Sequence, residues 1–187
     1  FNDNSINILD PICGKGTTLF EASIFGYNTY GVEINKKSTH EAITFFKKFL
    51  EKEKIKHKQE KKQVFGTNKN NSVMIEEFEY GKSKDDFKNN PRSLGIITGN
   101  TQELDKYFPT ENFHGMVGDL PYGIQHSNKN KGTKNSPTRN PIELINESIS
   151  AWYKVLKPSG TVVLSWNSLV MKKEEIAKVF EDNQFEV

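Results

Sequence analysis

Residues 10–17, DPICGKGT, follow a short apolar run at residues 6–9 and precede a stretch of helical character that Gly26 ends. A strand that closes in a glycine-rich turn and opens a helix begins several α/β folds, in which the turn and the helix N-terminus hold a small ligand. Two common versions of this turn do not fit the spacing. A dinucleotide-binding turn needs Gly or Ala where this chain has Leu19, and a phosphate-binding P-loop needs Gly at Leu9.

The rest of the chain repeats the same alternation of strand and helix. Further strands are predicted at residues 29–34, 94–98, 113–117 and 161–166, and helices at residues 17–25, 37–62, 101–108, 140–156 and 174–180. This order predicts βαβ units, and therefore a Rossmann-like, doubly wound α/β sheet whose strands are mostly parallel.

Two segments are longer than the connections of a minimal fold of this kind. Residues 63–93 are predicted to be an insertion whose centre, residues 73–80, forms an extra strand or hairpin. Residues 125–139 are predicted to be a mobile polar loop. The chain begins at Phe1 and ends in what resembles the start of a strand. We therefore expect residues 1–187 to be a single domain taken from a longer protein, with its C-terminal strands truncated.

Composition narrows the classes of function. The 187 residues are 34% hydrophobic, enough for one core, and no apolar run reaches the ~18 residues that a membrane span needs. The single cysteine, Cys13, excludes internal disulfides and favours the cytoplasm. Cys13 and the four histidines are scattered, so no metal site is predicted. The net charge of +2 is small, so nucleic-acid binding would need a local basic patch or a part outside this chain.

The charge of the first turn indicates the kind of ligand. Asp10 stands where it would repel a pyrophosphate but attract the ammonium and sulfonium groups of S-adenosylmethionine. Glu33 ends the second predicted strand, where an acid can bind ribose hydroxyls, and Asn100 follows the third, where it can meet adenine. The turn itself adds a set of cofactor-binding candidates: Pro11, Cys13, Gly14, Gly16 and Thr17. Within the turn, Cys13 is interpreted as a packing residue. The alternative to a cofactor site is a glycine-rich turn that binds no ligand.

A second loop, residues 119–123 (DLPYG), follows the strand predicted at residues 113–117. An exocyclic nucleobase amine is a poor nucleophile, and two acceptors that hold its N–H bonds favour a reactive, pyramidal nitrogen. The Asp119 carboxylate and the Leu120 carbonyl, directed by Pro121, can be those acceptors, and Tyr122 offers a ring for base stacking. Asp119 would also border the cofactor. A proline-aromatic turn with no catalytic role is the alternative.

Residues 10–17 and 118–123 together resemble the amino-methyltransferases that share an Asp/Asn-Pro-Pro-aromatic motif. More narrowly, they resemble the N2-guanine tRNA methyltransferases, whose catalytic domain usually follows an RNA-capturing THUMP domain. The resemblance implies a seven-stranded sheet with its last strand antiparallel. It also implies cofactor contacts at Asp10, Gly14, Gly16, Glu33 and Asn100, and substrate contacts at Asp119 and Tyr122. Leu120 stands where the first proline is commoner, and no THUMP-like segment is visible.

The resulting hypothesis is a cytoplasmic, S-adenosylmethionine-dependent RNA methyltransferase that forms N2-methylguanine in tRNA. The alternatives are a DNA methyltransferase acting on adenine N6 or cytosine N4, and a non-catalytic RNA-binding subunit with the same fold.

Several weaker candidates accompany these loops. Residues 47–62 hold eight lysines against three glutamates, and a solvated helix face is favoured over phosphate binding. Other residues are candidates for contacts with phosphates or base edges: Gln125, His126, Lys129, Lys131, Lys134 and Arg139. Trp166 and Asn167 either face the ligand crevice or, as favoured for the tryptophan, belong to the core.

Overall fold

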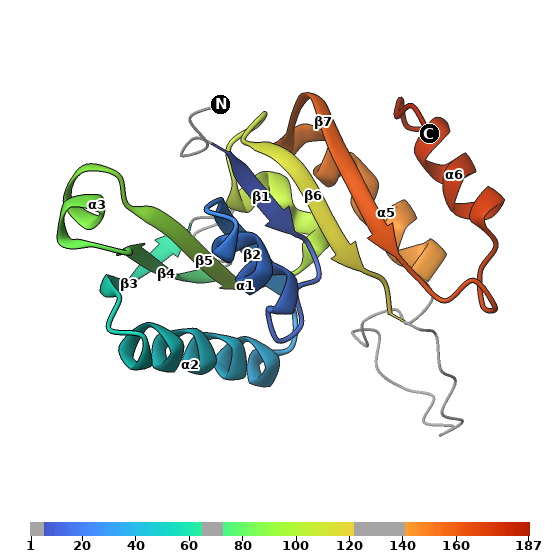
Figure 1. Ribbon diagram of the computed structural model, residues 1–187. Coiled ribbons are helices and arrows are strands. Elements are labelled where there is room, and N and C mark those ends of the chain that lie inside the picture. Colours follow the sequence, from blue (N-terminus) through green and yellow to red (C-terminus); the bar gives the residue numbers. More distant parts are fainter. Residues whose placement is uncertain (1–5, 65–72, 122–140) are drawn as a thin grey trace.

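The computed structural model describes residues 6–64, 73–121 and 141–187. Within them, seven strands form one sheet in the order β3-β4-β5-β2-β1-β6-β7 (Figure 1). The strands are β1 (Asn7–Asp10), β2 (Asn28–Glu33), β3 (Lys56–Val64), β4 (Val73–Gly81), β5 (Arg92–Thr98), β6 (Phe113–Asp119) and β7 (Leu156–Ser165). The helical segments are α1 (Thr17–Ile24), α2 (Lys36–Lys52), α3 (Lys84–Asn89), η2 (Thr101–Glu103), α4 (Leu104–Tyr107), α5 (Pro141–Val155) and α6 (Lys173–Glu181).

The five strands β5-β2-β1-β6-β7 are all parallel, which confirms the predicted Rossmann-like α/β class. β1 lies in the middle of this part and pairs with β2 on one side and β6 on the other. The chain order therefore reverses at β1, and in open α/β sheets ligands bind beyond the carboxyl ends of the strands at such a switch point. In Figure 1 the arrowheads of β1, β6 and β7 point to the same edge of the sheet.

The helix predicted over residues 37–62 is wrong in its second half. The helix α2 ends at Lys52, and β3 begins at Lys56. The buried residues of α2 end with Leu50, so the following residues have no apolar face to hold a helix against the sheet. Lys54 takes a left-handed φ of 54° and turns the chain back.

The extra strand expected at residues 73–80 is present as β4, which pairs antiparallel with both β3 and β5. β3 and β4 thus form a hairpin that extends the sheet beyond β5, and its first strand begins at Lys56, ahead of the residues 63–93 expected to be inserted. The antiparallel strands lie at this edge, whereas the last strand in the chain, β7, runs parallel to β6. In the register of the hairpin, Val64 of β3 lies opposite Val73 of β4. On the other side of β4, Ile75 lies opposite Ile97 of β5.

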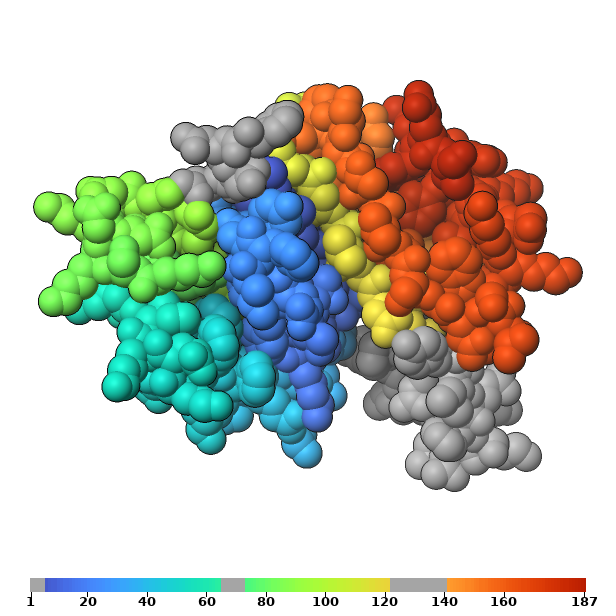
Figure 2. All heavy atoms as spheres, viewed as in Figure 1, coloured from blue at the N-terminus to red at the C-terminus, as the bar shows by residue number. Residues whose placement is uncertain are grey.

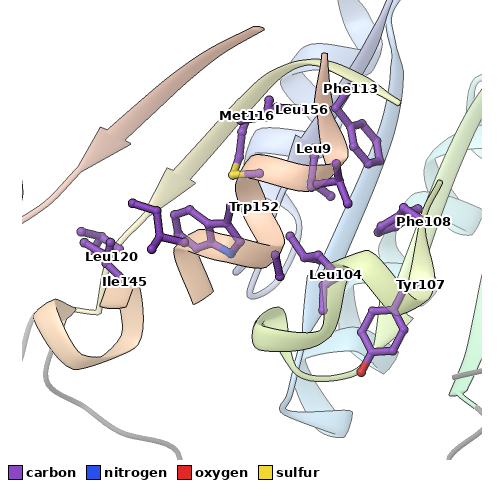
Figure 3. Packing of buried hydrophobic residues seen from close by; sticks show 14 of the residues in the cluster. Leu9, Leu104, Tyr107, Phe108, Phe113, Met116, Leu120, Ile145, Trp152 and Leu156 are labelled. Atoms are coloured by element: carbon purple, nitrogen blue, oxygen red, sulfur yellow. The ribbon is translucent and has the colours of Figure 1, made fainter. Parts of the chain in front are cut away.

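Helices cover both faces of the sheet and create two cores. On one face, α1 and α2 pack on β4 and β5 through residues that include Leu19, Phe46 and Phe78 (Figures 1 and 2). On the other, α4 and α5 pack on the central strands, and Trp152 lies between Met116 and Leu104 (Figure 3). Figure 2 also shows β6 and β7 at the surface beside α1, where Val163 is 54% exposed. Among the described helices, none is long and apolar enough to cross a membrane.

Trp152 is the side chain whose replacement tests the second core. It is fully buried, and its Nε1–H donates to Thr101 Oγ1 at 2.8 Å, which ties α5 to η2. Trp152→Phe is expected to lower the free energy of unfolding by about 2 kcal/mol, because it leaves a cavity and an unpaired hydroxyl. Urea denaturation measures the change. Tyr153→Phe is the control, since that exposed ring bonds only weakly to Gln184 at 3.4 Å, and an equal loss in both variants would contradict the prediction.

Candidate functional site

The turn after β1 is shaped by two glycines with left-handed backbones. Gly14 has a φ of 52° and Gly16 a φ of 85°, and Gly16 is the N-cap of α1. A Cβ on Gly16 would lie 2.9 Å from the ring of Phe20, so this position is closed to larger residues. A Cβ on Gly14 would meet nothing within 4 Å. Gly14 therefore presents its backbone to open space, as a surface for close ligand approach requires.

Glu33 holds this turn from the neighbouring strand. Its Oε2 accepts the Gly14 N–H at 3.1 Å, and its Oε1 accepts the Asn35 N–H at 2.6 Å. One carboxylate thus joins the turn after β1 to the residues after β2. The structure brings Glu33 against the glycine turn and gives it a role in shaping that turn. A carboxylate has about four acceptor positions, so these two bonds leave capacity for ligand hydroxyls.

Asp10 lies beneath the turn rather than at its mouth. Its side chain is only 3% exposed, because β1 is the central strand of the parallel part of the sheet. Its Oδ1 accepts the Ile12 N–H at 3.1 Å, within the turn itself and ahead of α1. Burial raises the pKa of Asp10 from 3.8 to about 7, hydrogen bonds from Ile12 and Thr18 oppose the rise, and the charges of Glu33 and Asp119 add to it.

The other residues of the turn have mainly structural surroundings. Cys13 is buried, its N–H donates to the Val32 carbonyl at 3.0 Å, and its side chain packs so closely on Gly31 that a Cβ there would lie 2.7 Å from the sulfur. Burial raises the pKa of the Cys13 thiol well above its usual range, in keeping with the predicted packing role. Pro11 is buried, and Thr17 is the exposed first residue of α1.

Asn100 follows β5 at the same edge and caps η2. Its Oδ1 accepts the Gln102 N–H at 3.1 Å, and its Nδ2 donates to Gln102 Oε1. Its backbone N–H donates at 3.1 Å to the Oη of Tyr107, which itself donates to Glu103. Burial raises the pKa of Tyr107 to about 12, so the phenol stays protonated at neutral pH. The sequence analysis did not identify Tyr107, which ends α4 seven residues after Asn100.

Asp119 is the last residue of β6 and is exposed, whereas Leu120 is buried beside Ile145 (Figure 3). The Ser165 hydroxyl donates to Asp119 Oδ1, and the Ser165 carbonyl accepts the Leu120 N–H at 2.9 Å. Ser165 is a second residue that the sequence analysis missed. The sequence shows Ser165 only as a polar residue in the strand predicted at residues 161–166. Its partner, Asp119, is identified by the pairing of β7 with β6.

The two loops meet in space. A Cβ on Gly118, next to Asp119, would lie 3.4 Å from Ile12 Cγ1 and 3.5 Å from Pro11 Cδ. The Asp119 charge also contributes to the raised pKa of Asp10. The carboxylates that end the three neighbouring strands β2, β1 and β6 therefore border one region at the carboxyl edge of the sheet.

The remaining candidates divide into three groups. Trp166 is partly buried against the core and donates to the Met171 carbonyl at 3.0 Å, which confirms its core role, and Asn167 Oδ1 accepts the Leu169 N–H at 3.0 Å. The lysines of residues 47–62 divide among α2, the turn at Lys54 and β3, so they do not form one helix face. A last group lies outside the described residues: Tyr122, Gln125, His126, Lys129, Lys131, Lys134 and Arg139. Among the described side chains, no cluster of potential metal ligands exists.

The raised pKa of Asp10 predicts an unusual dependence of stability on pH. The folded chain retains the Asp10 proton to about pH 7, whereas the unfolded chain releases it near 3.8. Since the folded state then binds more protons, the free energy of unfolding falls as the pH rises through this interval. Asp10→Asn keeps an oxygen for the Ile12 N–H without the charge, so its stability relative to wild type should increase by a few kcal/mol from pH 4 to 7. Denaturation curves at each pH test this, and parallel pH profiles would contradict it.

A family model described as an RMKL-like methyltransferase domain matches residues 3–179 of the chain. No curated protein sequence is significantly similar. Among solved structures, a protein of Pyrococcus horikoshii OT3 is similar with a TM-score of 0.50 and 17% identity, over 87% of this chain and 50% of its own. A putative rRNA methylase of Clostridium thermocellum has a TM-score of 0.50 and 15% identity, over 95% and 70%.

An rRNA methylase of Streptococcus thermophilus is similar at a TM-score of 0.50 and 13% identity, over 98% of this chain and 74% of its own. At these identities the likeness concerns the fold alone. The chain spans half the length of the Pyrococcus protein.

Proposed function

The chain belongs to the family of RMKL-like methyltransferase domains, and from this premise we propose that it transfers a methyl group from S-adenosylmethionine to the exocyclic N2 of guanine in RNA, most specifically in tRNA. The observation that carries the proposal is the meeting of two loops. The glycine turn after β1 and the Asp119–Pro121 segment after β6 border one another through Ile12, Pro11 and Gly118.

The residues around the turn fit the cofactor that family membership implies. Gly14 offers an open backbone, and the Glu33 and Asp119 carboxylates border a region suited to a ligand with ammonium and sulfonium groups, with the buried Asp10, whose pKa is raised to about 7, beneath it. Glu33 would hold the ribose and Asn100 the adenine of the cofactor. The glycine turn would hold its methionine part. When bound, S-adenosylmethionine supplies an electrophilic methyl group, and it requires neither a metal nor a covalent enzyme intermediate.

The chain contributes orientation at the acceptor. The Asp119 carboxylate and the Leu120 carbonyl accept the two N–H bonds of the amine, and so direct its lone pair toward the cofactor. Burial of the Leu120 side chain and the bond of its N–H to Ser165 hold this residue in place, and the fixed φ of Pro121 restrains the peptide that carries its carbonyl. Alignment of this kind contributes several kcal/mol to the rate of a two-substrate reaction.

The choice of RNA rests on the family and on the motif. Two structural neighbours are an rRNA methylase and a putative rRNA methylase, which supports an RNA substrate and makes rRNA the alternative to tRNA. Asp rather than Asn at position 119 favours guanine N2 over adenine N6. RNA capture by a THUMP-like domain outside this chain and action in the cytoplasm are parts of the same proposal.

Methylation of mixed substrates tests the proposal. The full-length protein is incubated with tritiated S-adenosylmethionine and, in parallel, with total tRNA, rRNA and duplex DNA, and the labelled nucleosides are identified by mass spectrometry. We expect N2-methylguanosine in tRNA. Labelled DNA with unlabelled RNA would instead establish the adenine-N6 or cytosine-N4 alternative. Labelled rRNA with unlabelled tRNA would change the RNA substrate from tRNA to rRNA and leave the rest of the proposal in place.

Calorimetry with S-adenosylmethionine tests the remaining alternative, a non-catalytic RNA-binding subunit. That alternative predicts no heat of cofactor binding, whereas the open turn at Gly14 and the Glu33 carboxylate predict saturable binding with one site per chain.

A further inference from the structure

Ser165 makes two contacts with the loop that carries Asp119. It ends β7 directly opposite Asp119, the last residue of β6. Its backbone carbonyl accepts the Leu120 N–H at 2.9 Å, and its hydroxyl donates to Asp119 Oδ1. One residue therefore holds both the side chain of Asp119 and the backbone of the residue after it.

These contacts matter because Asp119 is exposed. An exposed carboxylate at the end of a strand can change rotamer freely unless a partner holds it. The backbone pairing of β6 with β7 anchors the peptide between Asp119 and Leu120, and the Ser165 hydroxyl reaches the Asp119 side chain itself. A carboxylate has about four acceptor positions, so the bond at Oδ1 leaves acceptor capacity for a substrate amine.

We propose that Ser165 is a positioning residue for methyl transfer, whose hydroxyl aligns the Asp119 carboxylate while its backbone carbonyl anchors the peptide between Asp119 and Leu120. This inference rests on the proposed function, because it assigns those two acceptors to the substrate amine. Ser165 itself does not touch the amine. The sheet register supplies the alignment: it places a hydroxyl-bearing residue of β7 level with the end of β6.

Three variants separate the hydroxyl from the fold. Ser165→Ala removes the bond to Asp119 and keeps the backbone bond to Leu120, and Ser165→Thr keeps a hydroxyl in a residue that strands accept well. Thr161→Ala, four residues earlier on β7 and also exposed, is the control for loss of a hydroxyl from this strand. Cofactor affinity, kcat, KM for RNA and the melting temperature are measured for each.

Ser165→Ala is expected to lower kcat about tenfold, the effect of one lost orienting hydrogen bond, with cofactor affinity and melting temperature close to wild type. Ser165→Thr should restore most of kcat, and Thr161→Ala should leave it unchanged. In the Asp119→Ala background, Ser165→Ala should have no further effect, because the hydroxyl then has no carboxylate to orient.

The outcomes distinguish this inference from the function on which it rests. Unchanged kcat in Ser165→Ala, together with an inactive Asp119→Ala, would overturn the role of Ser165 alone. A fall in kcat that is accompanied by a clear fall in melting temperature in Ser165→Ala, without recovery of either in Ser165→Thr, would also overturn it. That result would indicate a structural role for Ser165. Full activity of Asp119→Ala would overturn the proposed function itself.

Discussion

Replacing Asp119 by alanine is expected to lower kcat about 10³-fold while leaving S-adenosylmethionine bound. The substitution removes the carboxylate that would accept one N–H of the amine, so the nitrogen keeps its delocalised, unreactive geometry. Glu33 and the glycine turn, which would hold the cofactor, keep their own hydrogen bonds. Single-turnover methylation measures the chemical step, and calorimetry measures cofactor affinity.

Two further variants sharpen this experiment. Asp119→Asn retains one acceptor oxygen, so its loss of kcat should be smaller, about 10- to 100-fold. Asp105→Ala is a matched control, because it removes a carboxylate on α4 that pairs with Lys154 on α5 in a partly exposed ion pair, outside both loops. If Asp119→Ala loses cofactor affinity and turnover by the same factor, Asp119 is a cofactor ligand and the assignment to the amine fails.

The parallel part of the sheet could be predicted from the sequence because its signals are local. Each strand is a short apolar run, and the glycines that follow a strand or end a helix, Gly14, Gly16 and Gly26, adopt a positive φ. The carboxyl-edge positions of Glu33 and Asp119 then follow from topology alone, since the ends of parallel strands meet at one edge.

The inserted hairpin could be predicted only in part. Residues 73–80 have the apolar alternation of a strand, but β3 is rich in lysine and glutamine and continues the composition of α2. What stabilises β3 is its partner: Lys62 pairs with Glu77 at 2.6 Å and Lys61 with Glu76 at 3.2 Å across the hairpin. Such cross-strand pairs depend on register, which the composition of one strand does not reveal.

The contacts within the site depended on tertiary structure in the same way. Ser165 and Asp119 are 46 residues apart and meet only through the pairing of β7 with β6. Asp10 also shows this limit. Its position before the turn suggested a residue open to the ligand, but the central place of β1 buries it, and burial raises its pKa. Asp10 therefore shapes the charge beneath the turn, while Glu33 contacts the turn from the side.

Glu33 accordingly carries the second large effect. Glu33→Ala removes the acceptors of the Gly14 and Asn35 N–H groups and the proposed partner of the ribose hydroxyls. Charge-assisted hydrogen bonds contribute about 1.5–3 kcal/mol each, so the dissociation constant for S-adenosylmethionine should rise at least 100-fold. The value of kcat at saturating cofactor should stay within about fivefold, because the Asp119 loop is intact and a fivefold change is only ~1 kcal/mol.

Glu41→Ala provides the control for this variant. Glu41 pairs with Lys15, in the same turn, at 2.8 Å, but the pair is exposed and such pairs contribute little. Its cofactor affinity should therefore equal that of the wild type. Isothermal titration of both variants, with kcat measured at saturating cofactor, separates binding from chemistry. A Glu33→Ala variant that binds the cofactor normally but turns over slowly would show that Glu33 acts on the reacting groups, because loss of a ribose contact and a loosened turn both weaken binding first.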